Sequence, residues 1–145
     1  MILYRIVRRV FWVATRLMWR VTFEGTENVP DEGPFILAPL HRSNIDFAMM
    51  SLVTRRKMRF MGKDSLWKVR WFGWFITTLG AYPVRRGVAD RESLRSTIDI
   101  LKGGEPLVLF PEGTRRSGPT VEDLYDGAAY VATRAGVPLV PVGIG

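Results

Sequence analysis

The chain has 145 residues, 47% of them hydrophobic and 24% charged, which is typical of one globular domain rather than of a disordered segment. It contains no cysteine and a single histidine, which excludes disulfides and cysteine nucleophiles and argues against a zinc site. The net charge of +7 suits nucleic acid, an anionic membrane or a phosphorylated substrate. Because the basic residues stand among tryptophans and aliphatic residues, with no nucleic-acid-binding motif, we expect an anionic membrane surface as partner and no nucleic acid.

Residues 2–20 have the periodicity of an amphipathic helix. At 100° per residue, arginines fall within an arc of roughly 60°, and apolar side chains occupy the other side. The arginines are Arg5, Arg9, Arg16 and Arg20, and the apolar residues are Leu3, Ile6, Val10, Val13, Ala14, Leu17 and Met18. Trp12 and Trp19 flank the apolar stripe, where indole rings suit a lipid–water boundary.

The arginines interrupt this segment too often for a membrane-spanning helix, which needs roughly 18 apolar residues, and no signal-peptide pattern is present. We therefore predict a membrane-interface helix over residues 1–20, followed by a single domain over residues 21–145. Packing of the helix against its own domain is the alternative.

Apolar runs bounded by turn residues alternate with helical patterns along the rest of the chain. We predict strands at residues 21–24, 34–40, 57–61, 80–84, 107–110 and 137–144, and helices at residues 44–55, 90–102 and 121–134. Glycines are expected to end the last two helices, at Gly103-Gly104 and Gly136. This alternation predicts an α/β fold with a mixed, largely parallel sheet flanked by helices. The chain stops at Gly145, directly after a predicted strand, and this ending fits a shortened protein or a partial gene product.

Residues 65–78 concentrate aromatic side chains next to two cations. The segment contains Trp67, Trp71, Phe72, Trp74 and Phe75, with Lys68 and Arg70. Residues 71–84 carry no charge, but this run is too short to span a bilayer. An interfacial element and an aromatic-rich core helix both remain open for this segment.

The first motif is His41-Arg-Ser-Asn-Ile-Asp46, at the carboxyl end of the strand predicted over residues 34–40. Open α/β sheets place ligand sites at this end of their strands. Asp46 is expected in the first turn of the next helix, where its carboxylate could accept the Nδ1 proton of His41 and leave Nε2 to act as a general base. Residues 43–46 also match the S-x-x-D capping box, in which Asp46 would merely close the helix. Both interpretations remain open on this motif alone.

The second motif is Phe110-Pro-Glu-Gly-Thr-Arg115, directly after a predicted strand. Pro111 ends the strand, and Gly113 lets the backbone approach a ligand closely. Glu112 can hold a hydroxyl group, and the planar guanidinium of Arg115 can bind phosphate. Together the two motifs predict a general base beside a loop that binds an anion and positions an alcohol.

With these motifs the chain resembles the glycerolipid acyltransferases typified by 1-acylglycerol-3-phosphate acyltransferase. The H-x4-D motif of that family corresponds to His41 and Asp46, and its F-P-E-G-T-R-S motif corresponds to residues 110–116, with Arg116 in place of the serine.

Two further blocks extend the resemblance. The family's G-x-x-F-I-x-R block corresponds to residues 80–86, where Pro83 and Val84 replace the usual Phe and Ile and Arg86 matches the arginine. A V-P-V strand at residues 140–142 is the fourth motif. The four motifs appear in the family's order and cover the chain from about residue 20 onward.

The resemblance implies transfer of a fatty acyl group from a thioester to the free hydroxyl of 1-acylglycerol-3-phosphate (lysophosphatidic acid), giving phosphatidic acid. His41 would deprotonate the hydroxyl, and Asp46 would orient His41. The substrate-binding residues implied are Arg86, Glu112, Gly113, Thr114 and Arg115, and Lys63 is a weaker candidate for the acceptor phosphate. The absence of cysteine agrees with direct transfer rather than a cysteinyl intermediate.

The donor implied is acyl-CoA or acyl carrier protein, with no metal and no organic cofactor. We expect monotopic or peripheral association with the cytoplasmic face of a membrane. One alternative keeps the reaction but changes the acceptor to glycerol-3-phosphate, another lysophospholipid or a glycolipid. Another is a non-catalytic lipid-binding relative, and nucleic-acid binding rests on charge alone.

Overall fold

The computed structural model describes residues 2–85, 91–118, 120–121 and 123–144. Within them the strands form one five-stranded sheet with the order β3-β2-β4-β1-β5. The strands are β1 (Ile36–Pro39), β2 (Arg59–Lys63), β3 (Ala81–Val84), β4 (Leu107–Val108) and β5 (Leu139–Val142). Each pairing is parallel, so the carboxyl ends of the strands meet at one edge. The predicted α/β class is confirmed.

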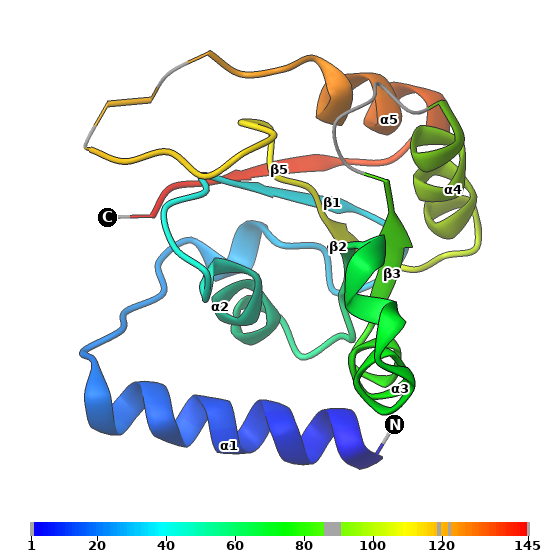
Figure 1. Cartoon of the computed structure of the whole chain (residues 1–145). Helices are drawn as coiled ribbons and strands as arrows, with labels where there is room; N and C mark the ends of the chain where they lie inside the picture. Colours follow the sequence, from blue (N-terminus) through cyan, green and yellow to red (C-terminus); the bar gives the residue numbers. More distant parts are fainter. Residues whose placement is uncertain (1, 86–90, 119, 122, 145) are drawn as a thin grey trace.

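Helices cover both faces of this sheet (Figure 1). They are α1 (Ile2–Met18), α2 (Asp46–Val53), α3 (Arg70–Thr78), α4 (Arg91–Lys102) and α5 (Gly127–Ala135), with short 3-10 turns η1 (Thr26–Asn28) and η2 (Asp64–Lys68). Figure 1 shows α2 on one side of the sheet, with α1 beyond it, and α4 and α5 on the other side.

The core has two parts because β1 is buried on both faces. Leu37 belongs to the cluster on the α2 side, and its neighbour Ile36 belongs to the cluster on the α4 and α5 side. Successive side chains of a strand point to opposite faces, so a continuous apolar run is what a central parallel strand requires. β1 therefore fixes the position of the residue that follows it, His41.

Two sequence predictions about secondary structure are wrong. Residues 21–24 form no strand, since β3 and β5 are the sheet's outer strands and nothing pairs with this segment. Its β-branched and aromatic residues match strand propensity, which depends on pairing and burial. The helix predicted from Val121 begins only at Gly127, because the Tyr125 amide donates to the Pro111 carbonyl at 2.8 Å and ties this segment to the second motif. The other boundaries shift by a few residues, and Gly136 ends α5 in a left-handed conformation as predicted.

The α1 helix packs on α2 through the side that holds Tyr4, Arg8 and Thr15. Tyr4 and Thr15 are buried. Arg8 donates from Nε to the Ser51 carbonyl at 2.8 Å and from Nη2 to the Thr54 carbonyl at 2.9 Å, at the end of α2. The helix thus contacts its own domain, as the alternative expected, but not through the apolar stripe.

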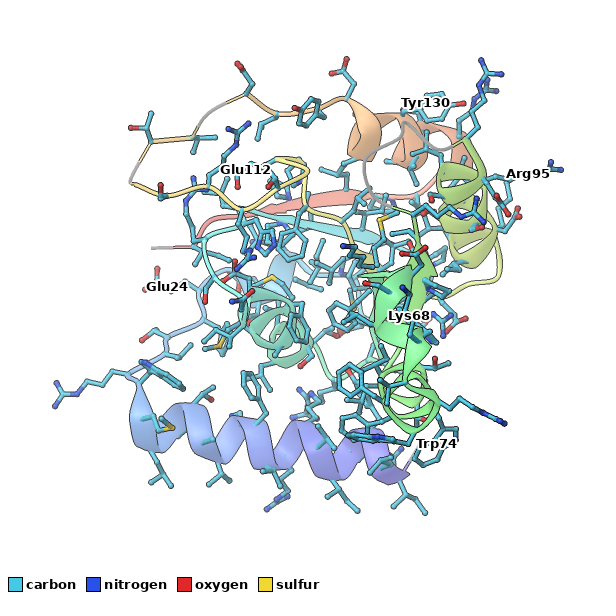
Figure 2. All side chains as sticks on the ribbon, viewed as in Figure 1. Glu24, Lys68, Trp74, Arg95, Glu112 and Tyr130 are labelled. Atoms are coloured by element: carbon cyan, nitrogen blue, oxygen red, sulfur yellow. The ribbon has the colours of Figure 1, made fainter. Side chains whose placement is uncertain are left out.

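The apolar stripe of α1 faces outward. Large apolar side chains at helical spacing are exposed there: Ile6, Val10, Val13 and Leu17. Leu17 is 81% exposed, although burial of such a side chain stabilises a folded protein by roughly 1.5–3 kcal/mol. Figure 2 shows a row of α1 side chains projecting away from the sheet. No helix among the described residues is long and apolar enough to cross a membrane.

The aromatic segment contains both packed and exposed side chains. Trp67 lies against Gly62 and Gly73, where an added Cβ would come within 2.8 Å of the indole, and its Nε1 donates to Thr77 Oγ1 at 2.8 Å. Trp71 and Trp74 on α3 are exposed instead. Figure 2 places Trp74 at the same lower side of the molecule as α1.

Candidate active site

His41 and Asp46 lie together at the carboxyl end of β1. Nδ1 of His41 and Oδ2 of Asp46 are 2.9 Å apart. Asp46 is the first residue of α2 and is 3% exposed, while the imidazole is 14% exposed. The pairing expected from the sequence is therefore present. An imidazole whose Nδ1–H is held by a carboxylate keeps Nε2 in the form that accepts a proton.

The same carboxylate also binds the loop that leads into α2. Oδ2 of Asp46 accepts hydrogen bonds from the backbone amides of Arg42 and Ser43, each at 2.6 Å. The contact to Ser43 is one half of the S-x-x-D capping box, but the Ser43 hydroxyl accepts from the Ile45 amide at 3.4 Å, and no side chain caps α2 at its N-cap residue, Ile45. Asp46 therefore binds the imidazole and the main chain of the loop before the helix, and only half of the predicted capping box is formed. A carboxylate at this position is also favoured by the helix dipole.

Residues of the second motif contact both the ring and the backbone of His41. Its ring stacks on Phe110 with centroids 4.1 Å apart and an interplanar angle of 24°. Its backbone amide donates to Oε2 of Glu112 at 2.6 Å, and its carbonyl accepts from the Arg116 amide at 2.9 Å. The second motif therefore contacts both the ring and the main chain of the candidate base.

Glu112 is fully buried and paired with Arg42. Nη1 of Arg42 lies 2.7 Å from Oε1 and 2.9 Å from Oε2 of this carboxylate. Burial is the largest influence on the pKa of Glu112 and raises it. The hydrogen bonds from the His41 amide and Arg42, with the charges of Arg42 and Arg116, outweigh burial and bring the pKa below its ordinary value. The carboxylate is therefore ionised at neutral pH.

Arg42 is the site residue that sequence reasoning missed. It directly follows His41, and its Nη2 also donates to the Thr120 carbonyl at 3.3 Å. A buried carboxylate needs a cationic partner, but the sequence points to Arg42 in this role only once the burial of Glu112 is known.

The loop after Glu112 exposes the rest of the second motif. Gly113 has φ +65°, and a Cβ there would lie 3.2 Å from the Tyr125 ring, so glycine is required. Thr114 and Arg115 are exposed. Nη1 of Arg115 donates to Oδ1 of Asn44 at 2.6 Å, which joins this loop to the first motif. A guanidinium here is accessible to an anion beside the His41 loop.

The remaining predicted cations lie on other strands. Lys63 is exposed at the carboxyl end of β2, and β4 separates β2 from β1. Arg86 lies outside the described residues, just after β3. Within the described part of the chain, no three or more histidine, aspartate or glutamate side chains converge as metal ligands.

An open, largely apolar groove of about 590 Å³ lies beside the second motif. It is lined by β1, β5, the segment before α5 and α5 itself, with Leu40, Pro111, Tyr125, Ala128 and Pro141 among its residues. None of the predicted site residues in the described part of the chain lines it.

Comparison with known proteins agrees with this architecture. The model of the acyltransferase family matches residues 20–145, so the chain belongs to the acyltransferase family. It is 34% identical over 134 residues to the 1-acyl-sn-glycerol-3-phosphate acyltransferase of Streptococcus pneumoniae, covering 87% of this chain and 49% of that protein. It is 30% identical over 142 residues to the protein of the same name from Bacillus subtilis, covering 96% of this chain and 69% of that protein.

A solved structure is also similar. The 1-acyl-sn-glycerophosphate acyltransferase PlsC from Thermotoga maritima matches with a TM-score of 0.66 and 29% identity, covering 81% of this chain and 46% of that chain. The chain thus spans about half the length of the Streptococcus and Thermotoga proteins. Fold and family are shared over that part.

Proposed function

We propose that this chain transfers a fatty acyl group from an acyl thioester to the free hydroxyl of 1-acylglycerol-3-phosphate, giving phosphatidic acid. The observation that carries the proposal is the His41–Asp46 pair at 2.9 Å, held beside the Arg115 loop. The names of the relatives from Streptococcus pneumoniae and Bacillus subtilis support the choice of acceptor.

The reaction balances with the groups of the site and the two substrates. Nε2 of His41 takes the proton of the acceptor hydroxyl as its oxygen attacks the thioester carbonyl. The carbon–sulfur bond breaks, the new ester forms, and the imidazolium returns the proton to the leaving thiolate. Asp46 stabilises the transient positive charge on His41. Since no electron is exchanged, we propose that the reaction uses no cofactor besides the donor, acyl-CoA or acyl carrier protein.

The acceptor phosphate needs a cationic side chain near the hydroxyl that reacts, and we assign this role to Arg115. Its guanidinium is exposed and bonded to Asn44, three residues after His41. Gly113 and Thr114 shape the same loop, and Lys63, at the carboxyl end of β2, is a further candidate. Arg86 remains a candidate from the sequence motif alone. An acceptor without phosphate would lose this contact, which separates lysophosphatidic acid from an uncharged glycolipid.

The test is thiol release from palmitoyl-CoA by the full chain in mixed micelles, with and without lysophosphatidic acid, beside His41→Ala. Acceptor-dependent release that the variant lacks would support the proposal. Release that ignores the acceptor, or that survives in the variant, would contradict it. A parallel series with glycerol-3-phosphate, another lysophospholipid and an acyl carrier protein donor identifies the substrates.

We further propose that α1 and α3 lie on an anionic membrane surface, on the cytoplasmic face where the thioester donors are found. The support is the outward apolar stripe of α1, flanked by exposed Arg5, Arg9 and Arg16, and the exposed Trp71 and Trp74 of α3. A lipid acceptor could then reach the site without leaving the bilayer.

Sedimentation with vesicles tests this membrane face. Val10→Asp places a charge on the stripe and should weaken binding to phosphatidylglycerol-containing vesicles by at least about tenfold, since roughly 1.5–3 kcal/mol of apolar burial is lost. Tyr130→Asp changes an exposed aromatic residue of α5, on the other side of the sheet, and serves as the matched control. Equal binding by both variants would refute the orientation.

A further inference from the structure

The carboxylate of Glu112 is turned into the protein. Its side chain has no exposed area, and both oxygens are occupied by hydrogen bonds from Arg42 and from the backbone amide of His41. A carboxylate that binds an acceptor hydroxyl must present a lone pair to the open side of the site. The geometry of Glu112 serves a different purpose.

We propose that Glu112 and Arg42 are positioning residues that fix the main chain of His41, and that Glu112 does not bind the acceptor. This inference rests on the proposed function, because it assigns how His41 is held for proton transfer. Three sets of contacts support this inference: those at the end of β1, those of the backbone amides that follow, and those of the Glu112–Arg42 pair.

The first set of contacts lies at the end of β1. The strand ends at Pro39, and the Leu40 amide still donates to the Val142 carbonyl of β5 at 3.1 Å. The next amide, that of His41, has left the sheet and donates to Oε2 of Glu112 instead. A buried amide without a partner would be costly, so Glu112 completes the backbone bonding at the point where the candidate base leaves the strand.

The second set of contacts involves the backbone amides of residues 41–43, which follow β1. The amides of His41, Arg42 and Ser43 all donate to carboxylates, the first to Glu112 and the other two to Asp46, each at 2.6 Å. The imidazole lies between these two acids: its own amide is held by Glu112, and its Nδ1 is held by Asp46. Loss of the contact to Glu112 would free the backbone of the residue that must be placed most accurately.

The third set of contacts pairs the charges of Glu112, Asp46 and Arg42. Two buried carboxylates lie next to one loop, and Arg42 spans them, since its guanidinium binds Glu112 and its amide binds Asp46. One nitrogen of its planar guanidinium, Nη1, reaches both oxygens of Glu112, while Nη2 donates to the Thr120 carbonyl, and a single lysine ammonium cannot reproduce this pair of contacts. Removal of one partner of a buried pair leaves an uncompensated charge, so the two side chains should act as one unit.

Steady-state kinetics on the full chain test the assignment with Glu112→Gln, Arg42→Lys and the double variant. Because misplacement of a catalytic group by about 1 Å can cost 100-fold, we expect kcat to fall roughly 10- to 100-fold in each, with the acceptor KM changed less than about twofold. The double variant should be no slower than the slower single variant. A raised acceptor KM with kcat retained, or additive losses, would overturn the proposal and return Glu112 to acceptor binding.

Glu105→Gln is the matched control. Glu105 pairs with Arg59 at 3.8 Å, at the amino ends of β4 and β2 and so at the opposite edge of the sheet from His41. The same chemical change there should leave kcat and KM at wild-type values. Circular dichroism and thermal melts confirm that each variant is folded.

Nuclear magnetic resonance of the imidazole gives a readout that needs no turnover. His41 is the chain's only histidine, so its ring signals in an untagged protein need no assignment. We expect Glu112→Gln and Arg42→Lys to shift or broaden these signals, and Glu105→Gln to leave them unchanged. Unaltered signals in folded Glu112→Gln would overturn the inference. If wild-type protein showed no acyl transfer, this measurement would still decide the positioning role separately from the proposed function.

Discussion

One oxygen of Asp46 binds two structures, the ring of His41 and the main chain of the loop that leads into α2. Oδ2 lies 2.9 Å from Nδ1 of His41 and 2.6 Å from the amides of Arg42 and Ser43. Orientation of the candidate base and the conformation of the loop before α2 therefore depend on the same atom. A substitution of Asp46 should change rate and stability together, and the two effects need separate measurements.

Asp46→Asn should lower kcat by roughly 100-fold or more, the range that general-base catalysis contributes, because an amide cannot stabilise the imidazolium. It should also lower the free energy of unfolding by about 1 kcal/mol, since an amide oxygen accepts the hydrogen bonds of the Arg42 and Ser43 amides more weakly than a carboxylate does. Acyl-transfer rates and urea unfolding check the two values. His41→Ala is the control, because it removes the base and leaves these two amide contacts in place. A stability loss in Asp46→Asn with the rate preserved would reduce Asp46 to a residue that orders the loop before α2.

Arg115→Met should raise the acceptor KM, since the exposed guanidinium is the proposed phosphate ligand. A charge-assisted hydrogen bond to phosphate contributes roughly 1.5–3 kcal/mol, which corresponds to an increase of about 10-fold or more. The donor KM should stay unchanged. Arg95→Met is the control, because it removes the same charge from an exposed position on α4, far from Glu112 in Figure 2. Equal effects of the two variants would indicate general attraction rather than a phosphate site.

The anchoring of α1 on α2 depends on Arg8. Arg8→Met should lower the free energy of unfolding by about 1.5–3 kcal/mol, because its guanidinium satisfies the Ser51 and Thr54 carbonyls that end α2. Arg9→Met changes an exposed neighbour on the same helix and should cost little. Urea unfolding without lipid compares the two. Equal stability of the variants would mean that the hydrogen bonds of Arg8 do not anchor α1.

The sequence predicted strands and site contacts best where the apolar pattern and the functional motif point to the same local structure. The apolar run of residues 34–40 correctly indicated a buried strand, because burial on both faces leaves no alternation. The H-x4-D spacing indicated the His41–Asp46 contact, since strand end and helix start lie close together. Residues 21–24 were predicted wrongly because their propensity says nothing about whether a neighbouring strand exists.

The sequence could not predict the direction of the Glu112 side chain. A glutamate in a loop beside a site is equally compatible with binding a substrate and with binding the main chain. The choice is made by Arg42 and the amide of His41, which come from a segment some seventy residues earlier in the chain. Such a contact follows from the order of β4 and β1 in the sheet rather than from any local pattern.

The ionised state of Glu112 makes the stability of the protein sensitive to acid. Its pKa is lowered in the folded protein, so the folded state binds this proton less readily than the unfolded state, whose glutamates titrate near about 4.3. The stabilisation is therefore fully present above that pH and is lost as the pH falls through the lower folded pKa.

Glu112→Gln should flatten the decline of unfolding free energy between neutral pH and about pH 3, because the amide has no proton to gain. At neutral pH the variant should be less stable than wild type, since Arg42 loses its buried partner. Urea unfolding at a series of pH values measures both. Glu105→Gln alters the half-exposed Arg59–Glu105 pair and should follow the wild-type curve closely. A Glu112→Gln curve parallel to wild type would show that acid unfolding is governed by other carboxylates.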